Sequence, residues 1–288
     1  MNVPAPFLRW AGGKRQLLPS LTAALPKTFD LTKNRFYEPF IGGGAFYFSL
    51  AQHPSATKLK PNVKRLVIND TNPDLIVTYQ TIKNNVGQLL ETLGELGSHI
   101  SETDYYTIRD QNPTDPVEVA ARFIYLNRLS FNGLWRVNRS GRYNVPYGKL
   151  KNPTLAQPQM LKACSTWLAH TDIRHGSYIT ALHDVKPGDV VYLDPPYIPI
   201  TKTSNFTGYN KDGFNVFDQW GLAGVIEGLN ANGVYVILSN SNTPETHNIF
   251  GRVLHLEPVT ARRSVGATKN TRKTVSEIIG TPHNPTAL

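Results

Sequence analysis

The stretch that most constrains the fold is a short apolar run that ends at an acid. Residues 190–193 predict a buried strand, and Pro195 and Pro196 stop this strand directly after Asp194. Ligands of open α/β sheets bind in the crevice beyond the carboxyl ends of the strands. We therefore expect Asp194 at a binding site, in a stiff turn that also presents backbone carbonyls and the ring of Tyr197.

The groups of this turn suit a flat ring that carries an amino group. A carboxylate and a carbonyl can accept the two hydrogens of an exocyclic amine while Tyr197 stacks on the heterocycle. The alternative is a strand exit stiffened by proline, in which Asp194 caps a loop, since Asp-Pro pairs are common in turns. The turn alone does not decide between these two interpretations.

Composition narrows the class of protein. The chain has 288 residues, of which 40% are hydrophobic, enough for one large domain or for a domain with an insertion. It has neither a long apolar run nor an N-terminus typical of a signal peptide, so we expect a cytoplasmic protein that does not enter a membrane. Cys164 is the only cysteine, which excludes an intramolecular disulfide and leads us to expect no metal site.

The charge of the chain favours a polyanionic partner. Lys and Arg outnumber Asp and Glu by 30 to 21, which gives a net charge of +9. A basic surface can simply be solvated, but nucleic acid is the leading candidate.

Two segments near the N-terminus contain clustered glycines. Residues 7–14 precede an apolar helix expected at 17–25, and residues 36–48 indicate a strand, a glycine turn and a helix. Such glycines let a ligand approach the backbone at a helix N-terminus, although residues 7–14 by themselves favour a loop-to-helix transition that needs flexible φ. The dinucleotide fingerprint and the P-loop pattern are both missing, so neither of those sites is predicted.

Asp70 ends a second predicted strand, at residues 65–70. A carboxylate at the end of this strand is placed to accept both ribose hydroxyls of an adenosine. Alternatively, Asp70 caps the helix expected to begin near Asn72 and Pro73. We favour the ribose, because this is the appropriate strand end.

Helical patterns dominate from residue 74 to about residue 170, with helices predicted at 75–82, 86–96 and 117–129. An all-helical block between two sets of strands indicates an inserted subdomain. Its centre contains a predicted hairpin turn at residues 138–141.

Basic and aromatic side chains alternate around this turn, and no acid occurs from residue 127 to residue 152. Basic side chains contact phosphates or guanine, and aromatic rings stack on bases or wedge between them. The weaker alternative is a hairpin that packs its aromatic rings inward and leaves its charges solvated. The residues concerned are Arg128, Arg136, Arg139, Arg142, Lys149 and Lys151, with Phe131, Trp135, Tyr143 and Tyr147.

Strands return after residue 173. We predict them at 190–193, 234–238, 253–256 and 275–279, alternating with helices, which indicates an α/β fold with a mostly parallel sheet. Phe206 or Tyr209 could close over a bound ring, but an ordinary surface loop explains that segment at least as well. A second basic run is interpreted as a loop that contacts phosphates, in preference to a solvated loop. That run consists of Arg262, Arg263, Lys269, Arg272 and Lys273.

Taken together, these segments resemble the Dam-type DNA adenine N6-methyltransferases, the D12 class or alpha group. The resemblance implies a Rossmann-like sheet that uses S-adenosylmethionine, with an inserted helical target-recognition subdomain that carries a β-hairpin. The implied catalytic domain comprises residues 1–72 and 171–288, and the DNA target-recognition subdomain comprises residues 73–170. The resemblance rests, in chain order, on Arg-Trp-Ala-Gly-Gly-Lys at 9–14, Glu-Pro-Phe-Ile-Gly-Gly-Gly at 38–44, Asn-Asp at 69–70, Phe-Asn-Gly-Leu-Trp-Arg at 131–136, Asn-Val-Pro-Tyr-Gly at 144–148 and Asp-Pro-Pro-Tyr at 194–197.

The resemblance also implies a reaction. A methyl group would pass from S-adenosylmethionine to N6 of an adenine that is flipped out of duplex DNA, without a metal or a covalent intermediate. The catalytic residues would be Asp194, Pro195, Pro196 and Tyr197, with the Asp194 carboxylate and the Pro195 carbonyl holding N6. The implied cofactor-binding residues are Trp10, Ala11, Gly12, Gly13, Lys14, Glu38, Pro39, Phe40, Gly42, Gly43, Asp70 and Asp194.

The best-known target of this family is GATC, and the resemblance assigns recognition roles. Arg136 would read one guanine and Arg9 the other, at a position where some relatives carry lysine. Leu134 and Pro146 would meet the thymine methyl, and Phe131 stands where some relatives carry an intercalating tyrosine. Asn132 and Asn138 complete the expected contacts to double-stranded DNA. A cognate restriction endonuclease would be a partner if the enzyme protects DNA rather than acting alone.

Two other functions remain open at this point. Asp-Pro-Pro-Tyr also resembles the catalytic turn of enzymes that methylate RNA bases or protein glutamine, although a hairpin suited to a duplex groove argues against a protein substrate. A DNA-binding protein without catalysis would need neither the glycine turn nor Asp194 and Tyr197.

Overall fold

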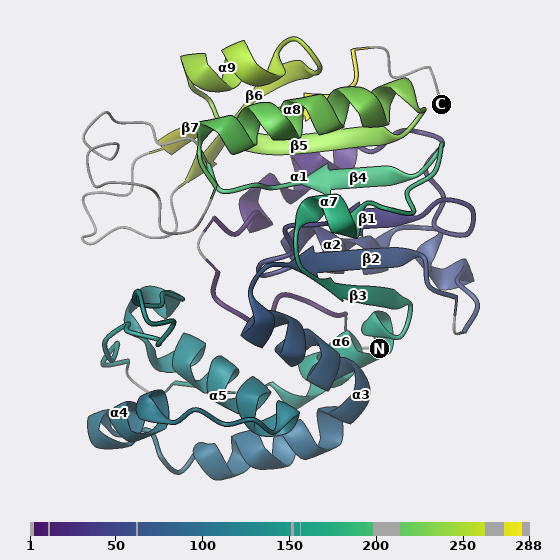
Figure 1. The fold of residues 1–288 in the computed structure, drawn as a ribbon. Helices are drawn as coiled ribbons and strands as arrows, with labels where there is room; N and C mark the ends of the chain where they lie inside the picture. Colours follow the sequence, from purple (N-terminus) through teal and green to yellow (C-terminus); the bar gives the residue numbers. More distant parts are fainter. Residues whose placement is uncertain are drawn as a thin grey trace. The chain divides into compact units, whose positions relative to one another are not determined.

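A seven-stranded sheet runs through the part of the chain that the computed structural model describes (Figure 1). The described residues are 3–10, 12–61, 63–150, 153–155, 157–197, 214–262 and 274–283. The strand order is β3-β2-β1-β4-β5-β7-β6. The strands are β1 (Phe36–Glu38), β2 (Leu66–Asp70), β3 (Thr171–His175), β4 (Val190–Leu193), β5 (Tyr235–Ser241), β6 (His255–Arg262) and β7 (Thr274–Thr281).

The register of the sheet confirms the predicted mostly parallel α/β fold. β1 pairs in parallel with β2 and with β4, and β4 pairs in parallel with β5, while β7 pairs antiparallel with both β5 and β6. The carboxyl ends of β1, β4 and β5 therefore lie on the same side of the sheet. Glu38 and Leu193 end β1 and β4, and Ser239 follows the β5 residue that pairs with Leu193.

Helices and short 3-10 turns connect these strands. The α-helices in the described part of the chain are α1 (Leu18–Ala23), α2 (Ala45–Ser49), α3 (Pro73–Leu96), α4 (Glu102–Asp110), α5 (Pro116–Leu129), α6 (Pro158–Leu168), α7 (Tyr178–Ala181), α8 (Val216–Ala231) and α9 (Pro244–Phe250). The 3-10 turns are Arg15–Leu17, Leu50–Gln52, Ala56–Lys58 and Phe131–Gly133. No helix in the described ranges is both long and apolar enough to cross a membrane.

The chain divides into two compact units, which we name the sheet unit and the helical unit. The sheet unit comprises Arg15–Phe40, Arg65–Ile68 and Tyr178–Leu288, and the helical unit comprises Met1–Lys14, Ile41–Lys64 and Asn69–Ser177. The functional boundaries expected from the sequence, at residues 72 and 170, stay a prediction.

The core of the sheet unit lies between the parallel strands and α8, which runs alongside β5 in Figure 1. Val191 and Val236 are fully buried there and pack in one cluster with Leu222 and Ile226 of α8. Burial on the strand faces explains why the strands consist of nearly continuous apolar runs.

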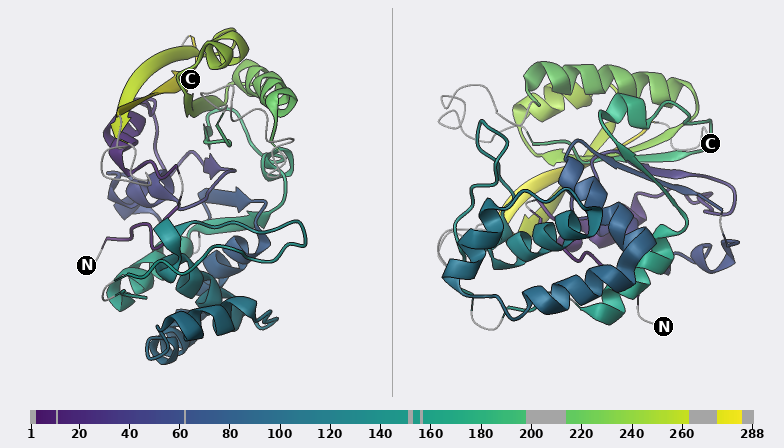
Figure 2. Two further views of the ribbon diagram at one scale, coloured as in Figure 1. Left: turned by 90° about the vertical axis from the view of Figure 1, so that its left-hand side faces the viewer. Right: turned by 60° about the horizontal axis from the view of Figure 1, so that its bottom comes forward.

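The helical unit is built on α3 and α5, which lie side by side in both views of Figure 2. Asn85 has non-helical backbone angles inside α3, which explains why the sequence indicates two helical segments there. The side chain of Asp115 caps α5 by accepting from two backbone N–H groups, and Pro116 supplies the first residue of the helix.

One strand was not predicted from the sequence. β3 consists of the polar residues Thr171–His175, and only Thr171 is fully buried. β3 lies at the edge of the sheet, where one side needs no neighbouring strand and polar side chains reach water. The apolar pattern that predicts a buried strand is therefore missing from β3. Helices α4 and α6 were also not predicted individually from the sequence.

Candidate active site and nucleic-acid interface

The glycine turn after β1 is packed against Trp10. Gly42 has φ +43°, and a Cβ at this position would lie 2.6 Å from Trp10 Nε1, so only glycine fits. The Gly42 N–H donates to Asp70 Oδ2 (3.1 Å), and its carbonyl accepts from the Tyr79 hydroxyl (3.0 Å). The structure therefore brings together Trp10, the glycine turn and Asp70 within the helical unit.

Asp70 holds this turn and does not cap α3. Its Oδ1 accepts from the Asn72 N–H (3.0 Å), and the Asn72 side chain is the cap, accepting from the Leu75 N–H (3.2 Å). Burial raises the pKa of Asp70, and the hydrogen bonds from Asn72 and Gly42 oppose this shift. Each carboxylate oxygen has two lone-pair sites, so Asp70 retains capacity for further hydroxyl donors.

The other residues expected to bind the cofactor differ in exposure: Lys14, Glu38 and Pro39 are buried, whereas Gly12 and Gly13 are exposed. Lys14 is buried, and its ammonium group donates to the Gly12 carbonyl. Glu38 is also buried at the end of β1, and in the sheet unit Phe40 stacks on Tyr178 with ring centroids 5.4 Å apart. Ala11 lies outside the described residues.

The predicted catalytic turn, residues 194–197 in the sheet unit, is anchored at three points. Ser239 Oγ donates to Asp194 Oδ1 (2.8 Å), Gln219 Nε2 donates to the Pro196 carbonyl (2.7 Å), and the Tyr197 hydroxyl donates to Glu277 Oε2 (2.6 Å). Pro195 is buried, and Asp194 and Tyr197 are half-buried. The turn is therefore a fixed scaffold that presents a carboxylate and an aromatic ring.

The three anchors were missed by sequence reasoning. Ser239 lies on β5, Gln219 on α8 and Glu277 on β7, all far from the turn in the sequence. Ser239 follows the predicted strand 234–238, at the same sheet edge as Asp194, and a polar residue at that point was the one available signal. The Gln219 and Glu277 contacts depend on helix orientation and antiparallel register, which single-sequence patterns do not encode.

The predicted hairpin turn is present in the helical unit. Val137 and Tyr143 form an antiparallel bridge, and the Asn138 N–H donates to the Arg142 carbonyl (2.8 Å). Asn138 Oδ1 stabilises the turn by accepting from the Ser140 and Arg142 N–H groups, both at 3.0 Å.

Most aromatic rings of the hairpin pack inward, as the alternative interpretation required. Trp135 lies against Phe123 with centroids 3.9 Å apart, the Tyr143 hydroxyl donates to the Leu134 carbonyl (2.9 Å), and the Tyr147 hydroxyl donates to the Ile100 carbonyl (2.8 Å). Phe131, by contrast, is 46% exposed. Of these rings, Phe131 is therefore the one available to a base.

The basic side chains of the hairpin mostly face solvent. Arg136, Arg139 and Arg142 are exposed, and Arg136 Nε donates to Asn144 Oδ1 (2.8 Å). Lys149 is also exposed, and its ammonium lies 3.9 Å from Glu102 on α4. Pro146 is exposed and Leu134 is half-buried. Lys151, residues 201–210 and residues 263–273 lie outside the described residues.

Asn127 connects Arg9 to the predicted recognition turn at residues 131–136. Its fully buried side chain accepts from the Arg9 N–H (2.9 Å) and donates to the carbonyls of Arg9 (2.7 Å) and Gly133 (3.0 Å). Gly133 has φ +65°, and a Cβ there would lie 2.5 Å from Arg9 Cβ. Two segments expected to contact DNA are therefore fixed to one another.

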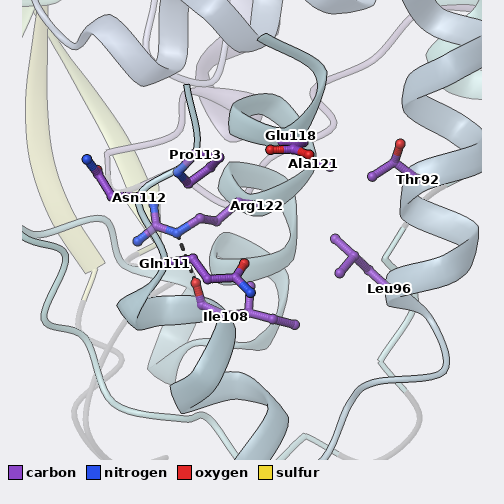
Figure 3. Close-up of a pocket in the computed structure, with 9 residues that line it drawn as sticks. All are labelled: Thr92, Leu96, Ile108, Gln111, Asn112, Pro113, Glu118, Ala121 and Arg122. Atoms are coloured by element: carbon purple, nitrogen blue, oxygen red, sulfur yellow. Dashed lines mark hydrogen bonds between the residues drawn. The ribbon is translucent and has the colours of Figure 1, made fainter. Parts of the chain in front are cut away.

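A cavity of about 420 Å³ lies between α3, α4 and α5 in the helical unit (Figure 3). Arg122 projects toward it while its Nε donates to the Ile108 carbonyl (3.0 Å). The predicted site residues are not among those that line it, so we assign it no part in the reaction. Within the described ranges, the acids, histidines and cysteine form no group of three suited to a metal ion.

Comparison with known proteins identifies the family. The family model of the D12 class N6 adenine-specific DNA methyltransferases matches residues 10–265. The chain is 38% identical to the type II methyltransferase M1.LlaDCHI of Lactococcus lactis subsp. cremoris, over 96% of this chain and 94% of the relative. It is 37% identical to the type II methyltransferase M.MjaIII of Methanocaldococcus jannaschii, over 93% and 95%. It is 33% identical to the DNA adenine methylase of Escherichia coli K12, over 95% and 93%. These matches confirm the resemblance, and the chain belongs to the D12 class of adenine-specific DNA methyltransferases.

Proposed function

We propose that the enzyme transfers a methyl group from S-adenosylmethionine to N6 of the adenine in GATC, after flipping this adenine out of the duplex. The observation that carries the proposal is the anchored turn of Asp194, Pro195, Pro196 and Tyr197 in a member of this family. An in-line attack by N6 is sterically blocked inside a stacked duplex, which is why the base must leave the stack.

The groups around the glycine turn fit S-adenosylmethionine. Asp70 would accept the ribose hydroxyls, because its oxygens retain lone-pair capacity beside the Gly42 N–H. A Cβ at Gly42 would collide with the Trp10 ring, so the glycine lets Trp10 lie directly against the turn. Trp10, Gly12, Gly13, Lys14 and Gly43 would complete the surroundings of the donor. When bound, S-adenosylmethionine supplies a methyl group on a positively charged sulfur.

The catalytic turn would position the adenine amino group. The Asp194 carboxylate and the Pro195 carbonyl accept the two N6 hydrogens, which turns the nitrogen lone pair away from the ring and toward the methyl carbon. Gln219 already donates to the Pro196 carbonyl, which supports Pro195 as the acceptor. As the new N–C bond forms, the bond from the methyl carbon to sulfur breaks and the sulfur takes its electron pair. N6 becomes positively charged, Asp194 stabilises this charge, and one N6 proton leaves to its carboxylate.

Recognition of GATC would depend on the two segments that Asn127 connects. Arg136 is exposed and pairs with one guanine through O6 and N7, and Arg9 contacts the other. Leu134 and Pro146 meet the thymine methyl. Phe131, the exposed ring, occupies the space that the flipped adenine leaves. Asn132 and Asn138 lie beside these residues on exposed turns.

The type II names of two relatives support a role in restriction and modification. In that case a cognate endonuclease cleaves the same site and methylation protects it. We infer the endonuclease from the names of those relatives alone.

Methyl transfer to short duplexes tests this proposal. Duplexes that contain GATC, and duplexes with one base pair changed at each position in turn, are incubated with labelled S-adenosylmethionine. We expect incorporation into GATC. Each changed base pair that the enzyme reads should weaken the interaction with the duplex by about 1–3 kcal/mol. Equal incorporation into all duplexes would refute GATC while leaving the reaction in place.

A further inference from the structure

A chain of hydrogen bonds leads from the core of the sheet into the catalytic turn. Ser239 Oγ lies 2.8 Å from Asp194 Oδ1 and 2.9 Å from the Tyr192 hydroxyl. Tyr192 is on β4 and Ser239 is on β5, which pair in parallel. Both side chains are buried, with exposed fractions of 1% and 0%, so water does not compete for these bonds.

The direction of the two hydrogen bonds follows from the number of hydrogens. An ionised carboxylate only accepts, so the single hydroxyl hydrogen of Ser239 is donated to Asp194. The Ser239 oxygen then accepts, and the Tyr192 hydroxyl must be the donor. Burial raises the pKa of Tyr192, which keeps this proton in place at neutral pH.

The hydrogen bond from Ser239 limits the rotation of the Asp194 carboxylate. A carboxylate that accepts from a fixed serine through Oδ1 loses rotation about its terminal bond, and its Oδ2 then points in one direction. The serine is itself fixed by Tyr192, whose ring belongs to the packed interior.

We propose that Ser239, supported by Tyr192, is a positioning residue for methyl transfer: it holds Asp194 Oδ1 so that Oδ2 is oriented for the adenine amine. The inference rests on the proposed function, in which Asp194 accepts an N6 hydrogen. It adds a two-residue support from β4 and β5 that lies outside the Asp-Pro-Pro-Tyr motif.

Steady-state kinetics with duplex DNA and S-adenosylmethionine test the proposal. Ser239→Ala should lower kcat roughly 10- to 100-fold, because a hydrogen bond to a charged group is lost, while both KM values stay within about twofold. Ser239→Thr keeps the hydroxyl and should recover most of kcat. Tyr192→Phe should show a smaller loss in the same direction.

Tyr235→Phe is the matched control, because Tyr235 is a buried tyrosine of β5 whose hydroxyl bonds to Thr281 rather than to the catalytic turn. It should retain kcat. A wild-type kcat in Ser239→Ala would overturn the proposal. So would a loss that appears only in KM, or a loss that Ser239→Thr does not recover.

A double-mutant cycle of Ser239→Ala and Asp194→Ala, measured by urea unfolding, tests the contact without methyl transfer. We expect the two effects on the free energy of unfolding to be non-additive. If the two effects are non-additive but the wild-type enzyme methylates no adenine, the contact is established and the proposed function is refuted. Additive effects would refute the support of Asp194 by Ser239.

Discussion

The Tyr197 hydroxyl donates a 2.6 Å hydrogen bond to Glu277 Oε2, which connects the catalytic turn to β7. Glu277 lies opposite Ser241 in the antiparallel pairing of β5 and β7. Burial raises the pKa of Tyr197, and the nearby Asp194 adds to this effect, so the phenol stays protonated and donates. The orientation of the ring is therefore set by a strand that lies 80 residues further along the chain.

Loss of this contact should slow methyl transfer. We expect Glu277→Ala to lower kcat roughly tenfold, because the Tyr197 ring, which we propose stacks on adenine, becomes free to rotate. Glu277→Gln retains a carbonyl acceptor and should lose much less. Single-turnover rates measure the difference, and equal rates for Glu277→Ala and the wild type would contradict a positioning role.

Asn127 should be needed both for stability and for site preference. Asn127→Ala leaves the carbonyls of Arg9 and Gly133 and the Arg9 N–H without this partner, so the free energy of unfolding should fall by about 1–3 kcal/mol. Because Arg9 and the recognition turn would no longer be fixed together, discrimination between GATC and altered duplexes should also fall. Asn112→Ala, an exposed control in the same unit, should change stability by less than about 0.5 kcal/mol. Unaltered discrimination in Asn127→Ala would show that this contact has only a structural role.

Two exposed arginines of the hairpin should behave differently. Arg136→Ala should relax discrimination at one guanine by about 1–3 kcal/mol, because a bidentate contact to the base is lost. Arg139→Ala, at the tip of the turn, should weaken binding to all duplexes alike. The slope of the logarithm of the binding constant against the logarithm of the salt concentration should fall by about one. Binding isotherms at several salt concentrations separate the two effects. Arg136 has no role in base reading if its variant shows the second behaviour.

Cys164 should not react in the folded protein. Burial raises the pKa of its thiol to about 12, so at pH 8 only about one part in 10,000 is thiolate. Since this is the only cysteine, a thiol reagent reports on it alone. We expect no reaction in native buffer and one equivalent after unfolding in urea. Rapid reaction of the native protein would contradict the burial of α6 against the N-terminal segment.

The predictable part of this fold lies where burial leaves a pattern. Residues 190–193 and 234–238 are apolar because both faces of their strands are covered, and the sequence therefore predicts them. β3 is at an edge and consists of polar residues, so its pattern does not distinguish it from a loop.

The candidate site also has a part that could be predicted from the sequence and a part that could not. Asp194 and the glycine turn follow predicted strands and were located from that position alone. The inward packing of Trp135, Tyr143 and Tyr147 was not predictable, because an aromatic residue beside an arginine suits either a core or a base. Glu277 and Gln219 reach the catalytic turn only through the three-dimensional register.

The central claim is that Asp194 serves methyl transfer to adenine N6, and product analysis tests it most directly. Plasmid DNA is incubated with labelled S-adenosylmethionine and either the wild type or Asp194→Ala, then digested to nucleosides and separated. We predict label in N6-methyldeoxyadenosine for the wild type and none for Asp194→Ala, with most DNA binding retained by the variant. Label in another nucleoside, or preserved turnover by Asp194→Ala, would contradict the account.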